Sequence, residues 1–210
     1  MPASLTCPAA MPTLDTAFAQ LDLIRQPEMA DEPLQAFDAA DEYLLAHLHE
    51  QGLNADSRVL LLNDGFGALA CSLATHCQVT SSSDSHLGFL ALQKNLASNG
   101  LSGDAVTFLP SSETPQGPFD WVLLRVPKTL ALLEEQLIRL HGQLAPGARV
   151  IAGAMIKHLP RSAGELTVAL MLGSSVTSAG MLKADQCQNP EAVGASGSMG
   201  GSECWKLSAA

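Results

Sequence analysis

The sequence predicts an α/β protein with a mostly parallel central sheet flanked by helices. Two continuous apolar runs, RVLLLN at 58–63 and FDWVLLRVP at 119–127, are typical of strands buried on both faces of a parallel sheet. Segments with a helical apolar period alternate with such runs along the chain, and the links between them are short. This alternation is the pattern of strand–helix–strand crossovers, and it indicates a Rossmann-like fold.

The predicted elements follow one another in a regular order. A short strand at 19–25 comes first, and a helix at 31–52 follows, with Asp31 as its cap, Pro33 in its first turn and Gly52 at its end. The other predicted strands span 58–63, 78–83, 105–110, 119–127 and 149–156, and the other helices span 68–76, 86–100 and 129–144. The residues expected to be buried in the strands are Leu60, Leu62, Val122, Leu124, Val150 and Ile151.

Changes in composition along the chain suggest three parts. Residues 1–30 are an N-terminal extension with a short strand, and 31–165 form the domain. Residues 166–210 end in a Gly-, Ser- and Ala-rich stretch with almost no apolar period, so we expect a divergent, flexible tail.

Composition excludes several classes of function. The formal net charge is -10, so the chain gains little from neutralising phosphates, and neither DNA binding nor tight RNA binding is expected. The five cysteines form no CxxC pair, which argues against a zinc site or a disulfide framework. The N-terminus does not resemble a signal peptide, and no apolar run reaches the ~18 residues of a membrane span. We therefore expect a cytoplasmic protein without a metal.

A glycine turn follows the strand at 58–63. It reads Asn63-Asp64-Gly65-Phe66-Gly67-Ala68-Leu69, and a Gly-x-Gly between a strand and a helix lets backbone N–H groups approach a ligand. Asp84 lies 19 residues after Gly65, just past the next strand, where an acid can accept hydrogen bonds from ribose hydroxyls. A solvated Asp84 in a Ser-rich loop is the alternative interpretation.

The order of these elements resembles a class I S-adenosylmethionine-dependent methyltransferase domain. The first motif there reads acid-x-Gly-x-Gly-x-Gly, but this chain has Asn63 in place of the acid and Leu69 in place of the third glycine. Amino-directed enzymes of that class commonly end the fourth strand with Asn/Asp-Pro-Pro-aromatic, whose first side chain accepts a hydrogen bond from the target amine. The segment 124–128 reads LRVPK, and Arg125 and Lys128 can only donate.

The resemblance therefore implies a methyltransferase-like domain without a catalytic residue. Its vestigial cofactor positions are Asn63, Gly65, Gly67 and Asp84, and its candidates for contact with RNA phosphates are Arg125 and Lys128. We expect a crevice between Gly65, Asp84 and 125–128 that is narrowed by Phe66 and Leu69. We also expect the Arg125 cation to repel a cationic sulfonium ligand, so that this chain binds no cofactor.

Five segments give a closer resemblance, to one family. PLQAFDAADEYLL, LLLNDGFGALACSLA, NLASNGL, VPKTLALLEEQL and RVIAGAMIKHLPR are similar to the N-terminal half of the G-type guanine-N2 methyltransferases of bacterial 23S rRNA, over roughly 33–165. That family carries two methyltransferase-like domains in tandem. The resemblance implies that the N-terminal one is degenerate and helps to hold RNA or to stabilise the protein, while the C-terminal one binds S-adenosylmethionine.

Three hypotheses remain open from the sequence. The first is a non-catalytic scaffold and RNA-positioning domain whose catalytic C-terminal domain is absent from this chain, with weak binding to rRNA by the chain alone. The second is a functional methyltransferase that uses Gly65, Gly67 and Asp84. The third is a truncated or frame-disrupted fragment without activity. Binding of S-adenosylmethionine separates the first two.

Overall fold

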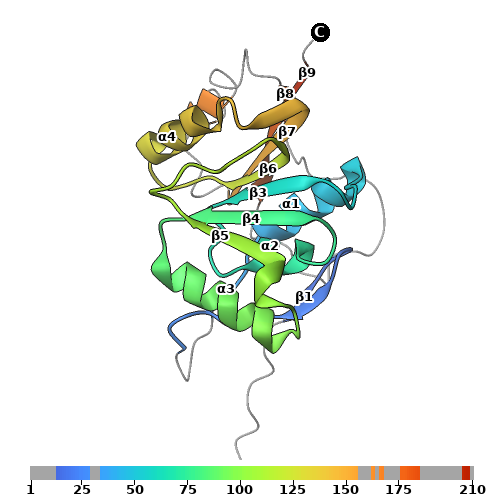
Figure 1. Cartoon of the computed structure of the whole chain (residues 1–210). Helices are drawn as coiled ribbons and strands as arrows, with labels where there is room; N and C mark the ends of the chain where they lie inside the picture. Colours follow the sequence, from blue (N-terminus) through green and yellow to red (C-terminus); the bar gives the residue numbers. More distant parts are fainter. Residues whose placement is uncertain are drawn as a thin grey trace, which may run out of the picture.

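The computed structural model of the chain describes residues 13–28, 34–155, 162–163 and 166–167, together with the backbone of two strands, β8 (Val176–Ala184) and β9 (Trp205–Ser208). The described elements form one seven-stranded sheet, a separate two-stranded hairpin and helices on both sides of the sheet (Figure 1). The α/β fold expected from the apolar runs is therefore confirmed.

The five predicted core strands are all present and run parallel. They are β3 (Arg58–Leu62), β4 (Gln78–Ser83), β5 (Val106–Pro110), β6 (Phe119–Arg125) and β7 (Leu144–Met155). The sheet order is β5-β4-β3-β6-β7-β8-β9, in which β8 is parallel to β7 and β9 is antiparallel to β8. After β3 the chain adds β4 and β5 on one side of β3, and it then adds β6 and β7 on the other side of β3. The strand order therefore reverses between β3 and β6. Open α/β sheets bind ligands outside the carboxyl ends of the strands at such a point.

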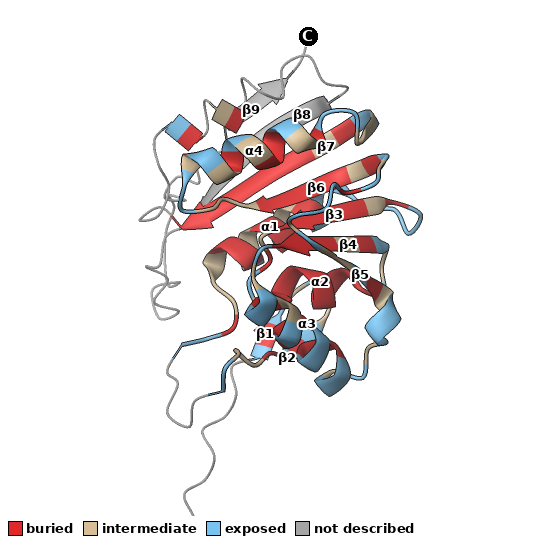
Figure 2. Ribbon diagram, turned by 60° about the vertical axis from the view of Figure 1, so that its left-hand side comes forward, coloured by how far each residue is buried: buried red, intermediate tan, exposed pale blue. Residues whose placement is uncertain are grey.

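Two apolar layers cover the faces of this sheet. The helices α1 (Ala39–Gln51), α2 (Ala68–Leu73) and α3 (His86–Ser98) pack with the hairpin on one face, where Leu61 and Leu123 are fully buried. The helix α4 (Leu130–Leu140) packs on the other face against Leu60 and Leu124. The central strands are red along most of their length in Figure 2, whereas α3 and α4 show pale blue outward sides. All six residues expected to be buried in the strands are buried, so that prediction is confirmed.

The first predicted helix begins later than its sequence suggested. Asp31 and Pro33 lie outside the described residues, Leu34 is 59 % exposed, and the helix has Asp38 as its N-cap. The Asp38 side chain accepts from the Ala40 N–H, while the Asp41 carboxylate accepts from the Asp38 N–H. This reciprocal capping box satisfies two N–H groups at once and fixes the start of the helix. The helix end at Gly52, with φ 80°, is confirmed.

The boundary between the last helix and strand also differs from the prediction. The helix ends at Leu140 rather than 144, and the strand already includes the Ala-Pro-Gly at 145–147 that was expected to lie before it. Gly147 has φ 84°, a conformation that glycine adopts without a steric penalty.

Both ends of the chain contribute strands. The expected short N-terminal strand is β2 (Gln20–Asp22), which pairs antiparallel with β1 (Thr13–Asp15). The range 166–210, expected to be a flexible tail, includes β8 and β9, and the structure does not describe most of its other residues. The three-part division of the chain stays a prediction.

Candidate functional site

Asn63 begins the glycine turn at the end of β3, in the left-handed conformation with φ 63°. Its Nδ2 donates to the Arg125 carbonyl oxygen and to Oε1 of Gln136, at 2.9 Å each, and its Oδ1 accepts from Nε2 of Gln136 at 2.8 Å. Asn tolerates this backbone conformation better than most residues, and a carboxylate could not donate these bonds. Asn63 therefore has a structural reason to replace the acid of the methyltransferase motif.

Asp64 lies inside the same turn and is buried, with 4 % exposure. Its Oδ2 accepts from the Ala70 N–H at 2.9 Å, whereas its Oδ1 has no hydrogen-bond partner among the described residues. Burial raises the pKa of this carboxyl, and the N–H groups of Ala70, Leu69 and Gly67 oppose that shift. The Ala70 N–H at the start of α2 thus already binds a carboxylate of the protein itself. No role was predicted for Asp64 from the sequence.

Close packing against α3 explains Gly67 of the turn, whereas a Cβ atom on Gly65 would meet nothing within 4 Å. A Cβ atom on Gly67, whose φ is 87°, would lie 2.8 Å from Cδ1 and 3.1 Å from Cα of Leu92. A Cβ on Gly88, in the first turn of α3, would lie 2.8 Å from the Gly65 carbonyl oxygen. Backbone therefore meets backbone here, which leaves little room for a ligand between the turn and α3.

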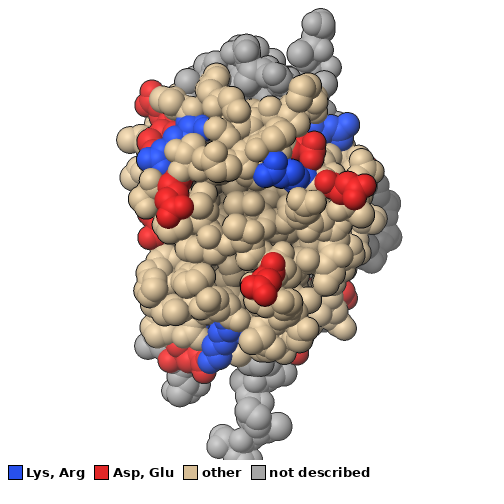
Figure 3. All heavy atoms as spheres, in the orientation of Figure 1, with Lys and Arg blue, Asp and Glu red and all other residues tan. Residues whose placement is uncertain are grey.

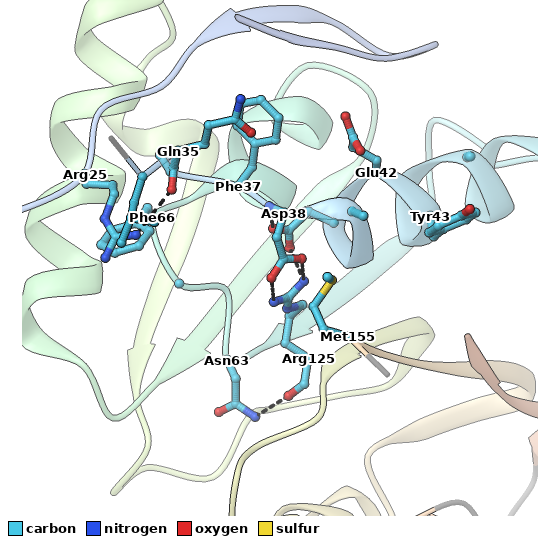
Figure 4. A pocket seen from close by; sticks show the side chains of 16 residues that line it. Arg25, Gln35, Phe37, Asp38, Glu42, Tyr43, Asn63, Phe66, Arg125 and Met155 are labelled. Carbon is cyan, nitrogen blue, oxygen red and sulfur yellow. Dashed lines mark hydrogen bonds and ion pairs between the residues drawn. The ribbon is translucent and has the colours of Figure 1, made fainter. Parts of the chain in front are cut away.

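An ion-pair cluster closes the end of β6. Arg125 donates to both carboxylate oxygens of Asp38, at 2.5 and 2.7 Å, and its Nη1 lies 3.1 Å from Oδ1 of Asp41 (Figure 4). The side chains of Arg125, Asp38 and Asp41 are 21, 34 and 8 % exposed. The acids at the start of α1 therefore hold Arg125 in the segment 124–128, which the resemblance compares with the Asn/Asp-Pro-Pro-aromatic motif.

The ionisation of this cluster follows from burial and pairing. Burial is the largest single influence on Asp38 and disfavours its charged form, but the hydrogen bonds and charge of Arg125, together with the N–H groups of Ala40 and Asp41, outweigh it and lower the pKa of Asp38. Burial dominates at Asp41 and raises its pKa to about 7, against the attraction of Arg125. Burial also works against the Arg125 charge, but the bonds to Asp38 and the charges of Asp41 and Asp38 raise its pKa. Arg125 is therefore a permanently charged centre with its partners in place.

A pocket of ≈ 740 Å³ opens beside this cluster. It brings together Asn63, Gly65 and Arg125 from the predicted site, and adds residues of α1 and of the chain before it (Figure 4). Asp84 and Lys128 are not among its described lining residues, and both are exposed. The predicted crevice is therefore only partly correct in its residues. The residues that the sequence prediction missed include Arg25, Phe37, Asp38, Asp41, Glu42 and Met155.

Two expectations about this pocket are wrong. Leu69 does not narrow it, because its side chain is fully buried in the core beneath α2, whereas Phe66 does line it. Arg125 does not present an unopposed cation either, since Asp38 and Asp41 balance its charge. Glu42 and Arg25 also line the pocket, so acidic and basic side chains both contribute to its walls.

The RNA-contact candidates differ in their surroundings. Lys128 is exposed on the segment after β6, while Arg125 is held by the acids of α1. On the face shown in Figure 3, basic side chains occur in small groups beside acidic ones. Their contact with RNA stays a prediction.

The described residues include neither a membrane-spanning helix nor a group of side chains placed to bind a metal. None of the described helices is long and apolar enough to cross a membrane. Within the same part of the chain, no group of three His, Cys, Asp or Glu side chains is placed to hold a metal ion.

The sheet order, the crossover helices and the glycine turn after β3 define a class I methyltransferase-like domain. The chain belongs to the family of RLMG N-terminal domains, whose model matches residues 11–186. It is 79 % identical over 156 residues to the ribosomal RNA large subunit methyltransferase G of Ectopseudomonas mendocina, and 73 % identical to that of Pseudomonas aeruginosa PAO1. The match covers 74 % of this chain but only 42 % of each relative.

Solved structures confirm the fold. A precorrin 8W decarboxylase of Methanobacterium thermoautotrophicum has a TM-score of 0.56 and 18 % identity, over 76 % of this chain and 83 % of that one. The Thermus thermophilus 16S rRNA N2 G1207 methyltransferase RsmC, in complex with AdoMet and guanosine, has a TM-score of 0.50 and 18 % identity, over 81 % of this chain and 40 % of that one. At such identities the likeness shows the fold alone.

Proposed function

We propose that this chain is the non-catalytic N-terminal domain of a 23S rRNA guanine-N2 methyltransferase, which acts in the cytoplasm as a scaffold and helps to position RNA. The catalytic, S-adenosylmethionine-binding domain lies outside this chain. The observation that carries the proposal is Arg125. This residue stands where an amine-accepting group is needed, it can only donate, and it is held by Asp38 and Asp41.

The glycine turn supports the same proposal, because its residues do not fit the cofactor. Asn63 uses both amide hydrogens and its oxygen within the protein, and Asp64 accepts from the Ala70 N–H that follows the turn. The close approach of Gly88 to the Gly65 carbonyl oxygen leaves little space there. Asn63 and Gly67, two of the four cofactor positions of the wider class, are thus engaged by contacts within the chain.

One observation favours the alternative, a domain that does bind the cofactor. The pocket is large enough for a small molecule, and the carboxylate of Glu42 in its lining suits a sulfonium cation. The two proposals differ in whether methyl transfer can occur without a second domain.

The test is a methyl-transfer assay with labelled S-adenosylmethionine and unmodified 23S rRNA. We expect no label in the RNA with this chain alone. Filter binding should show weak, salt-sensitive association, because the net charge is -10. A Lys128→Ala variant should weaken that association, and Lys94→Ala is the control at an exposed lysine paired with Glu28. Methylation of guanine N2 by the chain alone would overturn the proposal.

A further inference from the structure

The segment after the N-terminal hairpin runs along α3 and is bound by two asparagines of that helix. Nδ2 of Asn95 donates to the Ile24 carbonyl oxygen at 3.0 Å, and its Oδ1 accepts from the Ile24 N–H at 2.9 Å. Asn99 makes the same two bonds with Asp22, at 2.9 and 3.0 Å. Residues two apart on an extended chain and residues four apart on a helix are both spaced by ~6 Å. The side-chain amides of Asn95 and Asn99 can therefore each bond the backbone of one residue, Ile24 and Asp22 respectively.

Further contacts fix this segment at both ends. The Arg25 guanidinium lies 4.7 Å from the centre of the Phe66 ring, and Glu28 forms an ion pair with Lys94 of α3. At the hairpin, the Phe18 ring packs edge-on against His76, whose Nε2 lies 2.8 Å from the Phe18 carbonyl oxygen. The segment Gln20–Glu28 is therefore attached to α3 along its length and to the glycine turn at Phe66.

One buried side chain joins this segment to the turn. Asn95 is fully buried, and its Nδ2 also donates to the Phe66 carbonyl oxygen at 2.8 Å. The same amide thus bonds Ile24 of the segment and Phe66 of the turn. The turn lies between α3, which approaches it at Gly88, and Arg25, which covers the Phe66 ring.

We infer that Gln20–Glu28 is a strap that holds the glycine turn in its closed form against α3, with Asn95 as the positioning residue that couples the two. The N-terminal extension is then part of the site rather than an appendage to the domain. The inference concerns the closed turn itself and does not depend on the proposed role in RNA methylation.

The coupling has a structural consequence that can be measured. The Ala70 N–H donates to the Asp64 carboxylate, and the N–H groups of Gly67 and Leu69 lie near enough to that carboxyl to oppose the rise in its pKa. If the strap loosens, the turn should open locally and these amides should exchange faster, while the core strands stay protected. Asn95 itself is fully buried, so its replacement endangers the fold, and the strap is better weakened at half-buried residues such as Asn99 and Arg25.

The experiment is amide hydrogen exchange, followed by mass spectrometry, on the full chain. Asn99→Ala removes both hydrogen bonds to the backbone of Asp22, and Arg25→Ala removes the guanidinium that lies over the Phe66 ring. Neither of these side chains forms a hydrogen bond with the backbone of the turn. In each variant we expect exchange in peptides from 20–25 and from 63–70 to rise by about tenfold. Gln93→Ala, at an exposed position of α3, is the control and should change neither.

Three outcomes would overturn the inference. The strap peptide could exchange faster while 63–70 stays unchanged, which would show that the two are not coupled. A second such outcome is that neither variant raises exchange in the strap peptide, which would show that these contacts do not hold the strap. Exchange could also rise equally in β3 and β6, which would show general unfolding. Because no cofactor or RNA is used, none of these results decides whether the proposed function is correct.

Discussion

The ends of β3 and β6 lie side by side at the carboxyl edge of the sheet, but different chemistry closes each of them. Neutral amides close the end of β3, where Asn63 and Gln136 bond each other reciprocally. Charged groups close the end of β6, where Arg125 is held by Asp38 and Asp41. The first arrangement does not depend on protonation, whereas the second does. A methyltransferase-like fold can therefore occupy the carboxyl edge of its sheet with its own side chains in two physically different ways. We call them the neutral closure (Asn63 and Gln136) and the charged closure (Arg125, Asp38 and Asp41), and variants can separate their effects.

Replacing a core residue that lies beneath the ends of both β3 and β6 should have the largest effect on stability. Leu62 is 4 % exposed and pairs with Leu124 across β3 and β6, beneath both closures. Leu62→Asp places an unpaired charge in the core, at a cost of several kcal/mol against the ~5–15 kcal/mol that stabilise a domain. Circular dichroism should show an unfolded chain. A folded L62D variant of unchanged stability in urea would contradict the assignment of the core.

Breaking the charged closure should have the next largest effect. Arg125→Ala leaves Asp38 and Asp41 without their cation, and we expect a loss of about 2–3 kcal/mol, because the cluster is only partly exposed. The matched control is Arg149→Ala, which removes a guanidinium lying over Trp121 and should cost about 0.5–1 kcal/mol. Urea denaturation measures the free energy of unfolding of both variants. Equal losses in the two would show that the cluster stabilises the domain no more than an ordinary surface contact.

The charged closure should also make stability depend on pH. Asp41 has a pKa of about 7 in the folded chain, against 3.8 for the unperturbed group. The unfolded chain therefore loses this proton first, and stability should fall by a few kcal/mol as pH rises from about 4 to about 7, then level off.

Asp41→Asn tests this directly, since the amide oxygen can still accept from the Asp38 N–H. Thermal unfolding at pH 5 and pH 8 should show a smaller difference in Tm for the variant than for the wild type. Some difference should remain, because burial also raises the pKa of Asp64. An unchanged pH dependence in D41N would show that Asp41 is ionised throughout.

The neutral closure should give the smallest effect and no pH dependence of its own. Gln136→Ala leaves the Asn63 oxygen and one amide hydrogen without these partners, at a cost of about 1–2 kcal/mol. Glu134→Ala, at an exposed position of the same helix, should be within ~0.5 kcal/mol of the wild type. If the loss of unfolding free energy in Q136A differs between pH 5 and pH 8, the neutral closure also depends on protonation, which would contradict this comparison.

The sequence predicted the sheet well because its signals are local. Strands such as 58–63 and 119–127 are buried on both faces, so their apolar character is continuous and needs no knowledge of partners. The start of α1 was misplaced because Asp31-x-Pro33 and Asp38 are both acceptable local starts. The deciding signal was Asp41, three residues after Asp38, which completes the capping box.

The site was less predictable because its contacts join distant parts of the chain. Asp38 and Arg125 are 87 positions apart, and Asn95 and Ile24 are 71 apart. One available signal was missed: Asn95 and Gln136 are amides at core-facing positions of otherwise apolar helix faces, where a buried polar group needs partners. Asp84 lay near a plausible motif position, but nothing in its spacing could show that its side chain is exposed.

Calorimetric titration of the chain with S-adenosylmethionine tests most directly whether the carboxyl edge is closed by the protein's own residues. With Asn63, Asp64 and Arg125 all bonded internally, we expect no saturable heat up to ~1 mM ligand, which corresponds to about 4 kcal/mol of binding or less. Micromolar binding that is lost in Asp84→Ala would contradict the account, because it would mean that the glycine turn and Asp84 still form a working cofactor site.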